Sequence, residues 1–234
     1  MAKITAAHLY EERQLCTLFY LRNPNVRLIY VTSMPVDRAI VDYYLRLIEQ
    51  TSLVSYENAY KRLQMLNCND ASPLPLSAKI LRRPRMIEKI KSAIDPSIAY
   101  ITCFISSNLE REIALKIGIP LFANDPSLSY WGTKSGSREI FSEAGITYAD
   151  GTELVHTVDD LVLSIENFYT RRNFAIDKIV VKLNIGFSGE GNALLSCKHF
   201  EKGNLQKSIL AALENHLEYV YELETWSSFV EKLQ

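Results

Sequence analysis

A lysine and a glycine-rich loop follow one another near the end of the chain. The segment VVKLNIGFSGEGNALL, residues 180–195, reads as an apolar strand that contains Lys182, then a loop, then a second apolar stretch. A lysine inside a half-buried strand is costly unless a negative group meets it. The loop glycines are Gly186, Gly189 and Gly191. Glycine lets backbone N–H groups approach phosphate oxygens closely, so the segment favours polyphosphate binding, with a hydroxyl from Ser188.

Other loop types fit this segment less well. A P-loop needs a lysine directly after its last glycine, but Asn192 and Ala193 follow Gly191 here. The dinucleotide fingerprint of a Rossmann-type oxidoreductase needs a helix after the loop, whereas residues 192–197 read as a strand. An ordinary hairpin with a solvent-reaching lysine remains an open alternative.

A second basic feature opens a predicted helix over residues 133–144. In GTKSGSR, Lys134 and Arg138 are four residues apart, so they share one helix face and repel by about 0.2–0.5 kcal/mol. They also lie at the positive end of the helix dipole, which disfavours cations. A bound anion would relieve both effects and accept hydrogen bonds from the first helical turn. The alternative is that Glu139 and Glu143 neutralise the pair on a solvated surface.

The chain has two parts with different successions of strands and helices, and these elements must position the basic residues. The first part alternates apolar strands with helices, which predicts an α/β domain with a parallel sheet over residues 1–128. The second part, residues 129–234, starts with two helices and continues with the strand–loop–strand segment, which predicts an α+β domain. The expected strands are 27–33, 62–68, 98–104, 119–123, 178–184, 192–197 and 219–223.

Three further predictions concern individual segments of the chain. The first residues favour an amphipathic helix, with Cys16, Phe19 and Tyr20 near one face. Thr157 and Thr225 are expected to begin helices. Asp70 lies after a predicted strand, where it could contact a ligand or form a local turn.

Composition narrows the classes of function. The formal net charge of the 234 residues is −1, which argues against a general nucleic-acid or membrane-surface binder. The apolar runs are too short to span a bilayer. Four cysteines and four histidines are scattered, without a CxxC pair, so we expect reduced thiols, a cytoplasmic location and no metal site. The sequence does not indicate an oligomeric state.

The combined pattern resembles the ATP-grasp proteins. It is most similar to peptide ligases of the pheganomycin type, in which a pre-ATP-grasp domain comes first. The resemblance runs from about Arg27 to the C-terminus. The segments that carry it are YVTSMPVDRAIVDYYLRLI, NDASPLPLSAKIL, LEREIALKIGIPLFANDPSLSYWGTKSGSREIFSEAGI and VVKLNIGFSGEGNALL.

The resemblance implies an ATP-dependent carboxylate–amine ligase with a Rossmann-like first domain. In this family ATP phosphorylates a carboxylate, and an amine then attacks the acyl phosphate. Lys134 and Lys182 would contact the ATP phosphates, and the loop from Gly186 to Asn192 would cover the β- and γ-phosphates. The implied partners are ATP with Mg²⁺ and a small carboxylate and amine, such as amino acids or peptides.

The chain also departs from the family pattern. Family members hold adenine at a hinge, and Mg²⁺ with acids, in segments that come further along the chain. We therefore expect residues 129–234 to form an incomplete ATP-grasp domain, from a fragment, a split protein or a truncated product. No catalytic residue and no Mg²⁺ ligand can be assigned. A non-catalytic ATP-binding or protein-interaction module is the alternative function.

Overall fold

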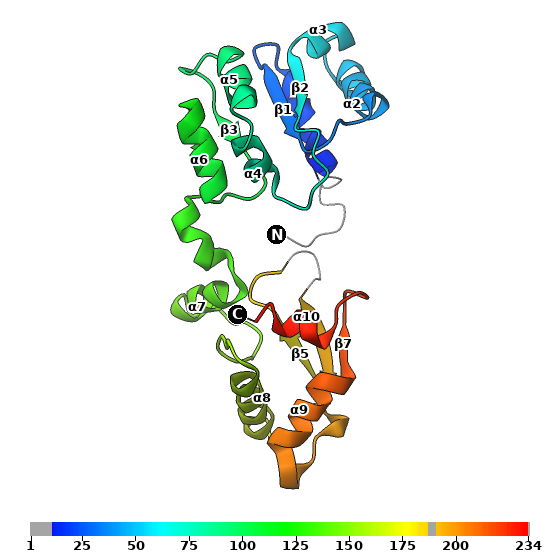
Figure 1. Cartoon of the computed structure of the whole chain (residues 1–234), viewed down its shortest axis with the longest axis vertical. Helices are drawn as coiled ribbons and strands as arrows, with labels where there is room; N and C mark the ends of the chain where they lie inside the picture. Colours follow the sequence, from blue (N-terminus) through cyan, green and yellow to red (C-terminus); the bar gives the residue numbers. More distant parts are fainter. Residues whose placement is uncertain (1–10, 187–190, 234) are drawn as a thin grey trace. The chain divides into compact units, whose positions relative to one another are not determined.

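The computed structural model describes residues 11–186 and 191–233 (Figure 1). The chain divides into two compact units, Met1–Pro126 and Ser127–Gln234. Each unit is described separately below. No helix in the described ranges is long and apolar enough to cross a membrane.

The first unit is built on two parallel strands with helices on both faces. Strand β1 (Leu28–Thr32) pairs with β2 (Leu63–Asn67) along their whole lengths. Helices α2 (Arg38–Thr51) and α3 (Tyr56–Lys61) connect them, and the side chain of Asp37 caps α2 by accepting the N–H of Ala39. Val41, Leu45 and Ile48 of α2 fall on one helical face and are buried.

A second parallel pair of strands in this unit is shorter than expected. Only Ile101–Thr102 (β3) and Leu121–Phe122 (β4) pair, so one continuous sheet is not formed in the described part of the unit. Pro120 has no N–H to donate, which limits pairing before Leu121. Helices α4 (Leu76–Leu81), α5 (Pro84–Ser92) and α6 (Asn108–Ile117) complete the unit.

The first described element is a 3₁₀-helix, η1 (Glu11–Arg22). It buries Leu15, Leu18 and Leu21, whereas Cys16 and Tyr20 are exposed. The prediction that Cys16 and Tyr20 share the packed face was therefore wrong. A 3₁₀-helix has three residues per turn, so every third side chain faces the core.

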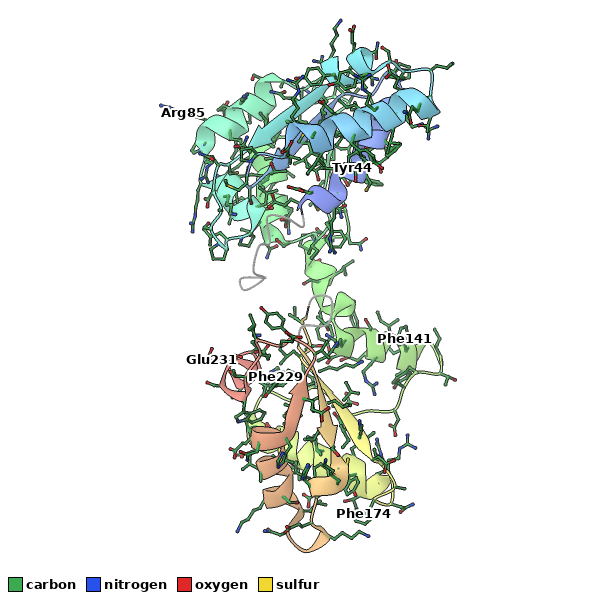
Figure 2. All side chains as sticks on the ribbon, turned by 90° about the vertical axis from the view of Figure 1, so that its right-hand side faces the viewer. Tyr44, Arg85, Phe141, Phe174, Phe229 and Glu231 are labelled. Atoms are coloured by element: carbon green, nitrogen blue, oxygen red, sulfur yellow. The ribbon has the colours of Figure 1, made fainter. Side chains whose placement is uncertain are left out.

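The second unit has an antiparallel sheet with helices on one face. The strands β5 (Lys178–Lys182), β6 (Asn192–Ser196) and β7 (Leu217–Tyr219) lie in that order. Helices α8 (Val158–Arg171) and α9 (Leu205–His216) pack on one face, and fully buried Phe229 of α10 (Trp226–Val230) joins the same core (Figure 2). Thr157 and Thr225 cap α8 and α10, as predicted.

Among the described residues, the other face of this sheet is left open. Alternation along β5 sends Val181 into the core and leaves Val180 54% exposed, with Lys182 exposed beside it. The strand predicted over 219–223 was misplaced, because β7 ends at Tyr219. The remaining elements of the unit are η2 (Pro126–Gly132), α7 (Lys134–Glu143), η3 (Cys197–His199) and η4 (Lys202–Asn204).

Candidate functional site

The glycine loop joins two antiparallel strands. Lys182 of β5 lies opposite Asn192 of β6, and Leu183 donates its N–H to the carbonyl of Gly191 over 2.7 Å. Gly191 has a φ of +74°, and a Cβ there would stand 2.9 Å from the Leu183 side chain. Both observations require glycine at this position. A strand rather than a helix follows the loop, so the dinucleotide fingerprint is excluded.

Lys182 lies on the open face of the sheet at the end of β5. Asn192 is half-buried across from it, and its side-chain oxygen is buried without a hydrogen-bond partner in the part of the chain that the structure describes. A buried acceptor of this kind normally finds a donor. The site thus offers a cation and an unused polar group next to each other.

Lys134, the first residue of α7, reaches the same end of β5. Its ammonium donates to the carbonyl of Leu183 over 2.8 Å. Burial lowers the pKa of Lys134, and the charge of nearby Lys182 lowers it further. The structure therefore brings the two lysines together from separate elements.

The backbone at the start of α7 is held by the protein itself. Asn184 accepts the Lys134 N–H at its carbonyl (3.4 Å) and the Ser135 N–H at its side-chain oxygen (2.9 Å). The Thr133 hydroxyl accepts the N–H of Gly136 over 3.1 Å. These N–H groups were expected to meet an anion, but in this structure they donate to protein oxygens. An anion at this site would be bound by side chains.

Gly136 sets the approach of α7 to the preceding turn. A Cβ at this residue would stand 2.3 Å from the carbonyl oxygen of Tyr130 in η2. Only glycine fits such a close backbone contact. The GTKSGSR motif therefore contains a packing glycine as well as its basic residues.

Arg138 faces a different part of the second unit. Its guanidinium donates to the carbonyl of Ala149 over 2.8 Å and lies 4.8 Å from the ring centre of Tyr148. Glu139, expected to neutralise the pair, accepts a hydrogen bond from the Tyr130 hydroxyl. In the structure, the side chain of Arg138 thus contacts the segment that follows α7.

In the part of the chain that the structure describes, the positive charge of the lysine pair has no carboxylate beside it. Within residues 11–186 and 191–233, neither ammonium lies within 4.0 Å of a carboxylate oxygen. Gly186 is exposed at the start of the loop. Ser188 and Gly189, also predicted to contact phosphate, lie outside the described residues. An uncompensated cation pair on an open face is suited to a polyanionic ligand.

Metal-binding groups are not gathered in the described part of the chain. It contains no group of three or more His, Cys, Asp or Glu side chains that could hold a metal ion. Mg²⁺ prefers several oxygen ligands in octahedral geometry. The described residues therefore do not fit a resident Mg²⁺.

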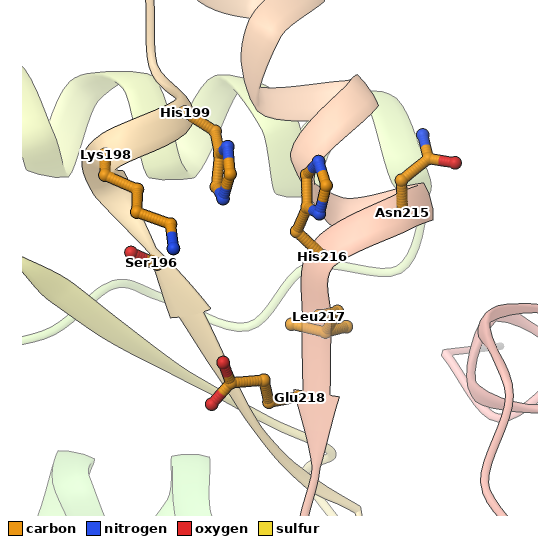
Figure 3. A pocket seen from close by; sticks show the side chains of 7 residues that line it. All are labelled: Ser196, Lys198, His199, Asn215, His216, Leu217 and Glu218. Atoms are coloured by element: carbon orange, nitrogen blue, oxygen red, sulfur yellow. The ribbon is translucent and has the colours of Figure 1, made fainter.

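A separate pocket lies at the opposite end of β6. The rings of His199 and His216 stack 4.0 Å apart, at an angle of 9° (Figure 3). Burial lowers the pKa of His199, and the charges of His216 and Lys198 lower it further. Neutral imidazoles stack without charge repulsion, so the pair is well suited to packing. The pocket is lined by Ser196, Lys198, His199, Asn215, His216, Leu217 and Glu218.

The first unit contains a buried lysine that sequence analysis missed. Lys79 is 1% exposed, and its ammonium donates to the Ser33 hydroxyl and the Asp70 carbonyl, each over 2.8 Å. The hydroxyl of Ser33 donates in turn to the Glu11 carboxylate over 2.6 Å. Two acids thus lie around this cation. Lys79 in SAKIL carries no local signal that separates it from a solvated lysine.

Asp70 makes local contacts at the end of β2. Its carboxylate accepts the Ser72 N–H over 3.0 Å and pairs with Arg83 over 3.0 Å. Hydrogen bonds from Ser72, together with Arg83 and Lys79, lower the pKa of Asp70 to about 2. Two roles were predicted for Asp70, ligand contact or a local turn, and the structure shows the local turn.

Comparisons with known proteins support the ATP-grasp resemblance. Residues 126–233 match the family model described as IQCH-like, ATP-grasp. L-propargylglycine–L-glutamate ligase from Streptantibioticus cattleyicolor is 31% identical over 146 residues, which cover 62% of this chain and 30% of the ligase. IQ motif-containing protein H from Danio rerio is 25% identical over 204 residues, which cover 82% of this chain and 19% of that protein.

The matches cover only part of each relative. The chain spans 30% and 19% of the lengths of these two relatives. No solved structure matches significantly. The family match covers the sheet β5–β6–β7 and helix α7, which carry the lysine pair. The comparisons support an ATP-grasp family domain in residues 126–233.

Proposed function

We propose that the second unit binds the phosphates of ATP and that the chain takes part in joining a carboxylate to an amine. The observation that carries this proposal is the convergence of Lys134 and Lys182 at the end of β5. Two neighbouring ammonium groups favour a ligand that brings several negative charges. A nucleoside triphosphate has this property.

The residues of the site fit phosphate groups. Lys182 extends from the open face, and Lys134 is held by the Leu183 carbonyl. Phosphate oxygens between them would remove the repulsion that lowers the pKa of Lys134. The unpaired side-chain oxygen of Asn192 could accept a hydrogen bond from a ligand hydroxyl or from a reoriented Lys182.

The ligase relative and the family match support the proposed reaction. A carboxylate oxygen of the first substrate attacks the γ-phosphorus of ATP, and ADP leaves. The amine of the second substrate then attacks the acyl carbon, phosphate leaves and the amine loses a proton. Charge develops on the transferring phosphoryl oxygens, and Lys134 and Lys182 are placed to stabilise it.

The finer assignment is also part of this proposal. We propose a peptide ligase of the pheganomycin type, in which the first unit acts as the pre-ATP-grasp domain. The substrates would be amino acids or peptides. The supporting observation is a relative named as an L-propargylglycine–L-glutamate ligase.

Calorimetric titration of the 234-residue chain with ATP and MgCl₂ tests the phosphate site. Lys182→Ala is expected to weaken ATP binding about tenfold, because one charged hydrogen bond is lost. Lys178→Ala is a matched control, since Lys178 is exposed at the other end of β5 on the same face. Equal affinities of the Lys182→Ala variant and the wild type would reject the proposed site.

The catalytic part needs a second measurement. ADP release is followed while the chain is offered ATP with mixtures of amino acids. ADP formed only when both substrates are present supports the ligase. Tight ATP binding without any ADP release favours the non-catalytic module instead.

A further inference from the structure

We infer that Asn184 is a positioning residue that holds Lys134 beside Lys182. The inference rests on the proposed function, because it concerns the same phosphate site. Asn184 lies just after β5 and is half-buried. It contacts α7 with its backbone and with its side chain.

The contacts form a small network across a long sequence separation. The carbonyl of Asn184 accepts the N–H of Lys134 over 3.4 Å, and its side-chain oxygen accepts the N–H of Ser135 over 2.9 Å. The neighbouring carbonyl of Leu183 accepts the Lys134 ammonium over 2.8 Å. Three donors from two consecutive residues at the start of α7 are thus bound by two consecutive residues that follow β5.

The same short segment places both lysines. Lys182 is fixed by its pairing with Asn192 in the sheet, and Leu183 is 4% exposed in the core. Asn184 follows directly and carries the start of α7. The separation of the two ammonium groups is therefore set by one stretch of backbone, whereas long side chains alone would leave it variable.

The side-chain chemistry favours asparagine at this position. An amide oxygen is a neutral acceptor for the Ser135 N–H. Aspartate would accept the same hydrogen bond, but it would add a negative charge near the cation pair and oppose phosphate binding. Alanine would leave the helix N–H without its partner.

A double-mutant cycle tests whether Asn184 acts through Lys134. ATP affinity is measured by calorimetry for the wild type, Asn184→Ala, Lys134→Ala and the double variant. Asn184→Ala alone is expected to weaken binding about fivefold. In the Lys134→Ala background the same change should have almost no effect. Equal, additive effects in both backgrounds would overturn the inference.

Two further variants accompany the double-mutant cycle, one as a control and one as a test of the charge argument. Asn215→Ala removes an amide that donates only to the Ala211 carbonyl of its own helix, and it should leave ATP affinity unchanged. Asn184→Asp should keep the Ser135 N–H protected from hydrogen exchange while still weakening ATP binding. Wild-type affinity in the Asn184→Asp variant would contradict the charge argument.

A readout without nucleotide separates this inference from the proposed function. The titration of Lys134 is followed by NMR of its side chain in the free protein. Loss of the Asn184 side chain should move the pKa of Lys134 back toward its ordinary value of 10.5. An unchanged titration would overturn the positioning role. Failure of the wild type to bind ATP would instead overturn the proposed function alone.

Discussion

Lys79 in the first unit and Lys134 in the second are both removed from solvent, yet their surroundings differ. Lys79 is 1% exposed, and the Glu11 and Asp70 carboxylates lie around its oxygen partners. Lys134 is half-buried, donates to a carbonyl and has another cation as its charged neighbour. Burial of a lysine is thus compatible with two roles. The two lysines differ in their charged surroundings: Lys79 is linked to Asp70 and, through Ser33, to the Glu11 carboxylate, whereas the charged neighbour of Lys134 is Lys182.

The largest expected effect concerns the structural cation. Lys79→Met keeps the aliphatic stem but removes the ammonium, so the Asp70 carbonyl and Ser33 lose their donor. We expect the free energy of unfolding of the first unit to fall by about 3 kcal/mol. Hydrogen exchange of β1 and β2 amides measures this loss locally.

The matched change in the second unit should behave in the opposite way. Lys134→Met removes a cation that is repelled by Lys182, so the stability of β5 and β6 should change by less than about 0.5 kcal/mol. The proposed difference between the two lysines would be contradicted if Lys134→Met destabilised its unit as strongly as Lys79→Met does.

A smaller effect is expected from the packing glycine of α7. Gly136→Ala forces a Cβ against the Tyr130 carbonyl, and we expect a loss of about 2 kcal/mol in the second unit. The better helix propensity of alanine, about 1 kcal/mol, should not compensate fully. Urea unfolding measures the difference. Gly132→Ala is the control, because nothing lies within 4 Å of its added Cβ.

The smallest effects are opposite responses to pH. Hydrogen bonds lower the pKa of Asp70 to about 2 from an ordinary 3.8, so its contribution to stability is lost as the pH falls from about 3.8 to about 2. The pKa of Lys134 is lowered from 10.5, so the unfolded chain binds more protons and stability rises as the pH approaches 10.5. Unfolding curves at each pH should show Asp70→Asn flattening only the acidic response and Lys134→Met only the alkaline one.

The predictions from sequence that agreed best with the structure were those that depend on several residues close together in the chain. The apolar runs around Ile29 and Val181 gave strands close to their observed bounds, and Thr157 and Thr225 begin helices as expected. These features depend on side chains only a few residues apart.

The weaker predictions depended on distant partners. An alternating pattern continues through residues 217–223, but β7 pairs only where β6 offers residues from Ala193 to Leu195. Lys134 and Leu183 are 49 residues apart, and Lys79 and Ser33 are 46 apart. No local pattern in the sequence encodes such contacts. Arg138 was grouped with Lys134 by helical spacing, whereas the Ala149 carbonyl determines where its guanidinium lies.

The strand end from Lys182 to Asn184 has a practical consequence for protein engineering. Its three side chains alternate between the open face, the core and the docked helix. One inserted residue would turn the leucine outward and the lysine inward, and would detach α7 at the same time. Tags and fluorescent reporters therefore belong elsewhere, for example after Gly203, where a Cβ would meet nothing within 4 Å.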